Sequence, residues 1–161
     1  MSKQTEVNVE SPDRTEKYEG VADQVVAHDA SVNNSFVGVV RAERHASVAN
    51  SIAAAFVAGQ NMDIAEGFGN AFVAGANIEM KGSSGLALVA GANIDIHGGG
   101  GCFLNCKQAT VENGTIGVLL APQAALGENV KVVMSTTQAI AMGAAFGLVA
   151  GVLGLLFRRR R

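Results

Sequence analysis

The stretch Phe56–Ile64 reads FVAGQNMDI, and its pattern returns as FVAGANIEM over Phe72–Met80 and as LVAGANIDI over Leu88–Ile96. Each copy begins 16 residues after the one before it. The same offset continues more weakly on both sides, so that residues 24–135 hold seven units of this length. A short fixed period is typical of repeated units that bury their apolar side chains by stacking on one another.

The apolar residues within a unit favour strands over helices. Ile52, Ala54, Phe56 and Ala58 alternate with other residues, and this period of two places them on one face of a strand. Two short strands and two corners fill 16 residues, whereas helical repeats need about 30 or more. The sequence therefore predicts an all-β fold, a parallel β-solenoid of about seven 16-residue coils.

Stacking the coils places equivalent residues in columns along the axis. We expect a main core ladder and, beside it, a column of small side chains at Ala58, Ala74, Ala90 and Cys106. A corner needing positive φ is predicted at the repeated glycines, followed by a ladder of stacked amides. The core ladder comprises Phe56, Phe72, Leu88, Leu104 and Leu120; the corner ladder comprises Gly59, Gly75, Gly91, Asn61, Asn77 and Asn93.

Composition and charge define the rest of the chain. Of 161 residues, 48% are hydrophobic and 16% are charged, which excludes disorder over the whole length. The net charge of −2 lacks the basic footprint of a nucleic-acid-binding protein, so we expect no nucleic-acid partner. We predict a polar flexible leader at 1–20, the β-solenoid at 21–136, a transmembrane helix at 137–157 and a basic tail at 158–161.

The membrane prediction depends on Ala139–Phe157, which carries no charge and no proline. As a helix this segment would span roughly 28 Å, close to the hydrocarbon thickness of a bilayer. Its glycine stripe favours helix packing, or simply reflects the glycine content of membrane helices. The stripe is Gly143, Gly147 and Gly151, and the membrane-interface residues are Arg158, Arg159, Arg160 and Arg161. Because residues 1–20 lack a secretory signal, we expect an inner-membrane protein with a single C-terminal anchor and a cytoplasmic solenoid.

Chemically active residues form no recognisable catalytic set. Asp63, Glu79 and Asp95 share one outward position, either as a solvated stripe or as a row relieved by a cation or a basic partner. The histidines do not share a position in the 16-residue frame, and both cysteines are expected to fill core columns. We predict no enzyme, no cofactor and no metal site. The histidines are His28, His45 and His97, and the cysteines are Cys102 and Cys106.

A short-coil solenoid with a polar leader and a membrane segment resembles the bactofilins over residues 24–135. This resemblance implies a cytoskeletal β-helical protein that polymerises end to end. We therefore expect a membrane-anchored scaffold that forms a homo-oligomer, with its solenoid end as the assembly surface. Two alternatives remain: an accessory subunit that docks a soluble enzyme onto a membrane complex through one flat face, and a surface adhesin. The adhesin alternative rests on residues 46–51, ASVANS, which are similar to repeats of trimeric autotransporter heads.

Overall fold

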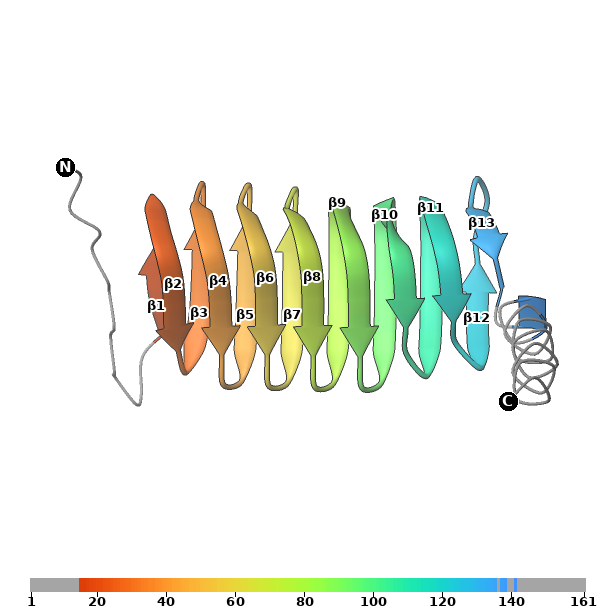
Figure 1. The fold of residues 1–161 in the computed structure, drawn as a ribbon, viewed down its shortest axis with the longest axis horizontal. Helices are drawn as coiled ribbons and strands as arrows, with labels where there is room; N and C mark the ends of the chain where they lie inside the picture. The colour runs from red at the N-terminus through yellow and green to blue at the C-terminus, as the bar shows by residue number, and fades with distance from the viewer. Residues whose placement is uncertain (1–14, 136, 139–140, 142–161) are drawn as a thin grey trace, which may run out of the picture.

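The chain folds into a parallel β-solenoid of about seven turns, seen in a computed structural model that describes residues 15–135, 137–138 and 141 (Figure 1). Every pairing between strands in this part of the chain is parallel, and each strand pairs with the equivalent strand of the next coil. The strands are β1 (Thr15–Tyr18), β2 (Val21–Ala27), β3 (Asp29–Asn33), β4 (Phe36–Ala42), β5 (His45–Ala49), β6 (Ile52–Ala58), β7 (Asn61–Ala65), β8 (Phe68–Ala74), β9 (Asn77–Ala90), β10 (Asn93–Asn105), β11 (Gln108–Leu120), β12 (Gln123–Leu126) and β13 (Lys131–Met134).

The strands form two layers that enclose the core. Sheet 1 contains β1, β3, β5, β7, β12 and the first halves of the long strands β9, β10 and β11. Sheet 2 contains β2, β4, β6, β8, β13 and the second halves of the same long strands. Sheet 2 is the layer nearer the viewer in Figure 1. The fold predicted from the repeat is confirmed at this level.

The first strand of the ladder begins before residue 21. Thr15–Tyr18 forms β1 and pairs with Asp29–Val32, and Tyr18 packs against the core. These residues were predicted to belong to the polar leader, so the expected boundary is six residues too late. The backbone pairing of β1 extends sheet 1 by one strand beyond the repeat visible in the sequence.

The core ladder is a column of fully buried side chains in sheet 2. Phe56 stacks on Phe72 with ring centroids 5.1 Å apart and an interplanar angle of 2°. Leu88 and Leu104 continue the column, and all four side chains have no exposed surface. Leu119 completes it, since Leu104 pairs with Leu119 and not with the predicted Leu120.

The shift from Leu120 to Leu119 has a local cause. Corners between sheet 2 and sheet 1 hold two residues in the regular coils, as at Gly91–Ala92 between β9 and β10. After Cys106 the corner holds Lys107 alone, so the offset from β10 to β11 is 15 residues, as in the pairing of Leu104 with Leu119. The same offset joins β2 to β4 and β11 to β12, as in the pairings of Val21 with Phe36 and of Gln108 with Gln123. The uniform 16-residue period is therefore wrong near both ends of the stack.

Alternation inside the sheet 2 strands is interrupted. In β6, Ala53 and Phe56 are buried whereas Ile52 is 44% exposed and Ala54 is exposed. Two consecutive residues, Ala54 and Ala55, lie between the buried positions, so the strand turns its first residue outward. The predicted inward placement of Ile52 and Ala54 is wrong, and β4 and β8 show the same pattern.

Candidate interaction surface

The corner glycines are required by close contact between coils and not by positive φ. A Cβ atom on Gly59 would lie 1.9 Å from the carbonyl oxygen of Glu43, and one on Gly75 would lie 2.0 Å from that of Gly59. Gly91 meets Gly75 in the same way, at 2.0 Å. None of the three has positive φ, so that part of the prediction is wrong.

Positive φ belongs instead to the opposite turn, between sheet 1 and sheet 2. Each successive coil from Asn34 onward has a residue with positive φ at this turn, the coil of β10 has a second one at Gly99, and most residues of the column are not glycine. Asparagine suits this conformation because its short polar side chain tolerates the left-handed region. The column comprises Asn34, Asn50, Glu66, Gly82, Gly98, Asn113 and Asn129.

A buried hydroxyl column stands beside this turn and was missed by the sequence analysis. The Ser51 hydroxyl accepts a hydrogen bond from the Ser35 backbone N–H at 3.2 Å and donates to the Ala49 carbonyl at 2.7 Å. The Ser83 hydroxyl likewise accepts from the Gly67 N–H at 3.0 Å. Ser35, Ser51 and Ser83 are each 1% exposed. The sequence signal that could have revealed these serines is their spacing of 16 or 32 residues. Each lies next to the turn that holds the column of positive-φ residues.

The predicted amide ladder forms one inter-amide bond. Nδ2 of Asn77 donates to Oδ1 of Asn61 at 2.9 Å, and the Asn61 amide lies 3.4 Å from Nδ1 of His45. Asn93 pairs in register with Asn77, yet Oδ1 of Asn77 is buried without a hydrogen-bond partner. The amide chain therefore stops at Asn77.

The outer face of sheet 1 carries the charged groups of the central coils. Asp63, Glu79 and Asp95 lie in register on consecutive coils, flanked by Ser47 and by Thr110. Nζ of Lys81 lies 2.8 Å from Oε1 of Glu79. This hydrogen bond lowers the pKa of Glu79 and raises the pKa of Lys81, so one carboxylate of the row is neutralised by a neighbour on its own strand.

Two of the three histidines, His28 and His97, each pair with a single carboxylate of an adjacent coil. Nδ1 of His28 lies 2.7 Å from Oε2 of Glu43, and Nδ1 of His97 lies 3.1 Å from Oε2 of Glu112. No group of three or more potential metal ligands occurs in the part of the chain that the structure describes. At the same edge as His28, Arg44 lies 2.7 Å from Asp29. Partial burial raises the pKa of Asp29, but hydrogen bonds from Arg44 and from the His45 N–H outweigh it, and the pKa is lowered.

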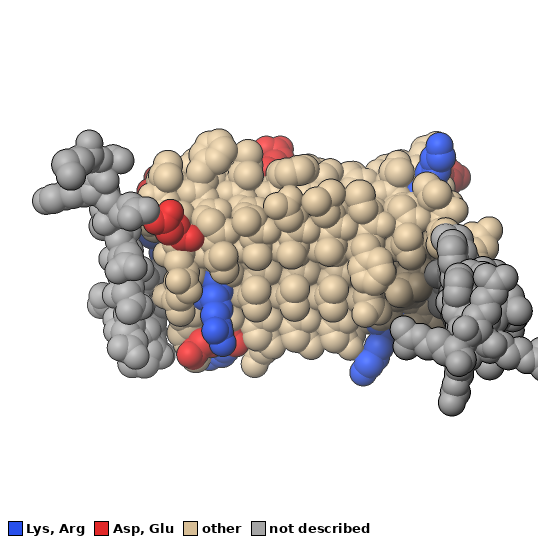
Figure 2. All heavy atoms as spheres, in the orientation of Figure 1, with Lys and Arg blue, Asp and Glu red and all other residues tan. Residues whose placement is uncertain are grey.

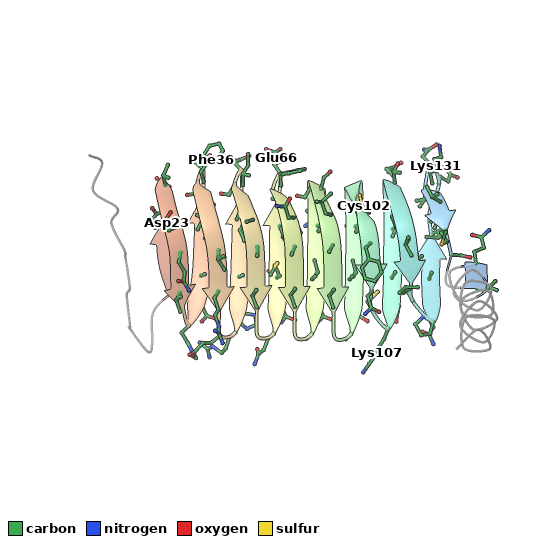
Figure 3. The ribbon with its side chains drawn as sticks, viewed as in Figure 1. Asp23, Phe36, Glu66, Cys102, Lys107 and Lys131 are labelled. Carbon is green, nitrogen blue, oxygen red and sulfur yellow. The ribbon has the colours of Figure 1, made fainter. Side chains whose placement is uncertain are left out.

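Sheet 2 presents a face of opposite character. Its strands from β6 to the second half of β11 contain no Asp, Glu, Lys or Arg. Figure 2 shows this face as a broad uncharged area with acidic and basic side chains at its margins. Asp23, Glu66, Lys107 and Lys131 mark those margins in Figure 3. We name this area the uncharged face: the outward residues of β4, β6 and β8 and of the second halves of β9, β10 and β11, apart from Arg41.

Large and small side chains are arranged in columns across the uncharged face. The outer column lies at the first residue of each strand and runs through Phe36, Ile52 and Phe68, which are 60%, 44% and 48% exposed. The inner column lies nearer the middle of each strand and runs in register through Val39, Ala55, Ala71, Ala87, Phe103 and Val118. Contiguous exposed apolar surface of this kind marks an interaction site more often than a plain solvated surface.

The two cysteines lie on opposite sides of the sheet, contrary to the prediction that both fill core columns. Cys106 is 6% exposed, and burial raises the pKa of its thiol. Cys102 is exposed on the uncharged face, between the outer and inner columns (Figure 3). The prediction holds for Cys106 and is wrong for Cys102, because the interrupted alternation also affects β10.

The predicted membrane helix falls almost entirely outside the described residues, as do Gly143, Gly147, Gly151 and Arg158–Arg161. Thr137, Gln138 and Ala141 are helical, and the Ser135 N–H donates to Oε1 of Gln138 at 3.0 Å. Among the residues with described positions, no helix has the length and hydropathy to cross a bilayer.

No protein family, curated protein or solved structure matches this chain.

Proposed function

We propose that this protein is a non-enzymatic, membrane-anchored β-solenoid that acts as a scaffold or polymerising element. The observation that carries the proposal is the columnar surface: two outward positions keep one kind of side chain on three successive coils, in the Asp63–Glu79–Asp95 row and in the Phe36–Ile52–Phe68 column. An enzyme concentrates different groups at one place, whereas a repeated surface offers the same contact many times.

The ends of the stack support assembly along its axis. In the described ladder β1 pairs only with β3, and β2 pairs only with β4, so each leaves one strand edge open. At the other end β12 and β13 pair only with β11. An open strand edge offers unpaired N–H and C=O groups to another chain. End-to-end stacking would continue both sheets from one molecule to the next.

Support for the membrane anchor comes from the sequence. The apolar segment Ala139–Phe157 has the length of a bilayer-spanning helix, and Arg158–Arg161 would lie among headgroups. Gly143, Gly147 and Gly151 would let two such helices approach closely. The solenoid would then be held at the cytoplasmic surface of the inner membrane, where a local high concentration favours assembly.

The test is flotation of the full chain with lipid vesicles, followed by electron microscopy of the vesicle surface over a range of protein concentrations. We expect the chain to float and its assemblies to lengthen with concentration. The double variant Val149→Arg with Leu153→Arg should stay at the bottom of the gradient while keeping its β-type circular dichroism. A full chain that fails to float, or that stays monodisperse at every concentration, would contradict the scaffold proposal.

The accessory-subunit alternative is favoured by the uncharged face, whose exposed apolar side chains another protein could cover. The accessory-subunit alternative predicts a chain that floats with the vesicles but stays monodisperse at every concentration until a partner is added. The concentration series therefore separates the two functions.

A further inference from the structure

We propose that the uncharged face binds the uncharged face of a second copy of this chain, related by a two-fold axis that runs parallel to the solenoid axis. The inference rests on the scaffold proposal and adds a lateral contact to the expected contact at the ends. Assembly at the ends was expected from the resemblance to proteins that polymerise end to end, and Ile52 was separately predicted to lie inward. The observed outward position of the Phe36–Ile52–Phe68 column makes a side contact available.

Size complementarity identifies the occupant. A two-fold axis placed between the outer and inner columns sets the outer residue of each coil against the inner residue of the same coil in the other copy. On the coil of β6 this pairs Ile52 with Ala55, and on the coil of β8 it pairs Phe68 with Ala71. These two coils each bring one large and one small side chain to the contact, and the symmetry makes both contacts at once. The β4 coil instead pairs Phe36 with Val39, and the β9 coil pairs Ser84 with Ala87.

The coil of β10 reverses the order of sizes and still fits. Its outer position is Gly100, which is buried and in register with the exposed Ser84, and its inner position is Phe103, in register with Ala87. The symmetry therefore sets Phe103, which is 36% exposed, over the glycine of the other copy. A face that docked lipid would have no reason to exchange large for small between the two columns of one coil.

The dimensions and chemistry also suit a second copy. The uncharged coils have the same rise of about 4.8 Å in both molecules, so their columns remain in step along the whole contact. Five coils and strands of about seven residues give roughly 550 Å² of flat area per copy, or about 1,100 Å² per pair, which passes the lower limit for a specific interface. The lack of charge across β6, β8 and the second halves of β9, β10 and β11 matches the core of an interface.

Cysteine cross-linking of the full chain in lipid vesicles tests the pairing. The proposed axis passes between the two columns, where Cys102 lies on β10 and Asn70 lies on β8. We expect mild oxidation or a short bismaleimide to join wild-type chains through Cys102 into a dimer. Cys102→Ser should abolish the dimer, since the remaining Cys106 is buried. Adding Asn70→Cys to Cys102→Ser should restore it.

The matched control is Ser47→Cys in the Cys102→Ser background, which places an exposed thiol on the outer face of sheet 1. It should remain monomeric. Phe68→Lys should lower the yield of the Cys102 dimer about tenfold or more, because pairing would bury an unpaired charge.

Equal cross-linking at Ser47 and at Asn70 would mean random collision and would overturn the inference. So would a lack of dimer at both Cys102 and Asn70. If these thiols are then protected from a water-soluble maleimide only when vesicles are present, lipid covers the face instead. In each of these cases the flotation and concentration series would still decide the scaffold proposal separately.

Discussion

At the residue scale, Phe56 and Phe72 form a stacked pair of fully buried rings in the core ladder. Phe72→Ala should lower the free energy of unfolding by about 3–5 kcal/mol, because the ring has no exposed surface and its loss leaves a cavity between Phe56 and Leu88. Asp63→Ala, on the exposed outer row, should change stability by less than about 0.5 kcal/mol. Chemical denaturation of the two variants measures both, and equal losses would contradict the assigned faces.

Two glycines of the same coil should respond differently to substitution. Gly75→Ala should cost about 3 kcal/mol or more, since the new Cβ would lie 2.0 Å from a backbone carbonyl that cannot move without breaking the ladder. Gly82→Asn should cost less than about 1 kcal/mol, because its turn position is open and asparagine already occupies it at Asn50 and Asn113. Thermal melting of both variants gives the comparison, and tolerance of Gly75→Ala would refute the close contact.

The Glu79–Lys81 pair predicts a pH dependence of stability. Because the folded pKa of Glu79 is lowered, its contribution is present above the unfolded pKa and is lost as the pH falls through the folded value. The raised pKa of Lys81 makes its contribution complete below the unfolded pKa, and it is lost only as the pH rises through the folded value. The pair is therefore fully charged between about pH 5 and about pH 10.

The variant Lys81→Met isolates this pair. Its melting temperature should fall below that of the wild type at neutral pH, by a small amount because both side chains are largely exposed. The difference should shrink as the pH is lowered to about 3, and added salt should reduce it at neutral pH. A difference that grows on acidification would show that the two groups do not stabilise each other.

At the scale of the strand, the repeat predicted which elements form but not every face. The offset of 16 residues placed Phe56, Phe72 and Leu88 in one column because three nearly identical units leave little choice of register. A simple period of two failed at Ile52, because Ala54 and Ala55 both lie between the buried residues of β6. The residues of β6 that precede this pair therefore lie on the opposite face from the one that alternation predicts. For the same reason, the exposed column through Ile52 on the uncharged face was not predicted from the sequence.

Corners show a second limit of sequence reading at this scale. Sequence alone does not distinguish a glycine that is required by a nearby carbonyl oxygen from one that is required by positive φ. Gly75 is of the first kind and Gly82 of the second, and the difference is seen only when the coils are stacked. The loss of one corner residue after Cys106 is also invisible where the repeat has weakened, so Leu120 was aligned in place of Leu119. Both errors arise from contacts between coils, which no single unit encodes.

At the scale of the whole molecule, the central coils share one offset of 16 residues, so we expect that one whole coil can be removed. Deleting residues 65–80 joins Ile64 to Lys81, a residue that already pairs in register with Ala65. Leu88 would then stack on Phe56, and Asn93 on Asn61, so every column continues. Since each coil contacts only its neighbours, we expect a folded chain with one coil fewer and a cooperative melt at a moderately lower temperature.

Deleting half as many residues, 65–72, is the matched control. It would join Ile64 to Val73 and set strand residues opposite corners, so that Ala74, Ala76 and Ile78 fall out of their columns. Buried backbone groups would lose their partners, and the expected result is loss of the β-type circular dichroism and of the melting transition. If the 16-residue deletion unfolds the chain as completely as the 8-residue one, stability does not reside in contacts between neighbouring coils, and a scaffold built by repeating those contacts at the ends would lose its physical basis.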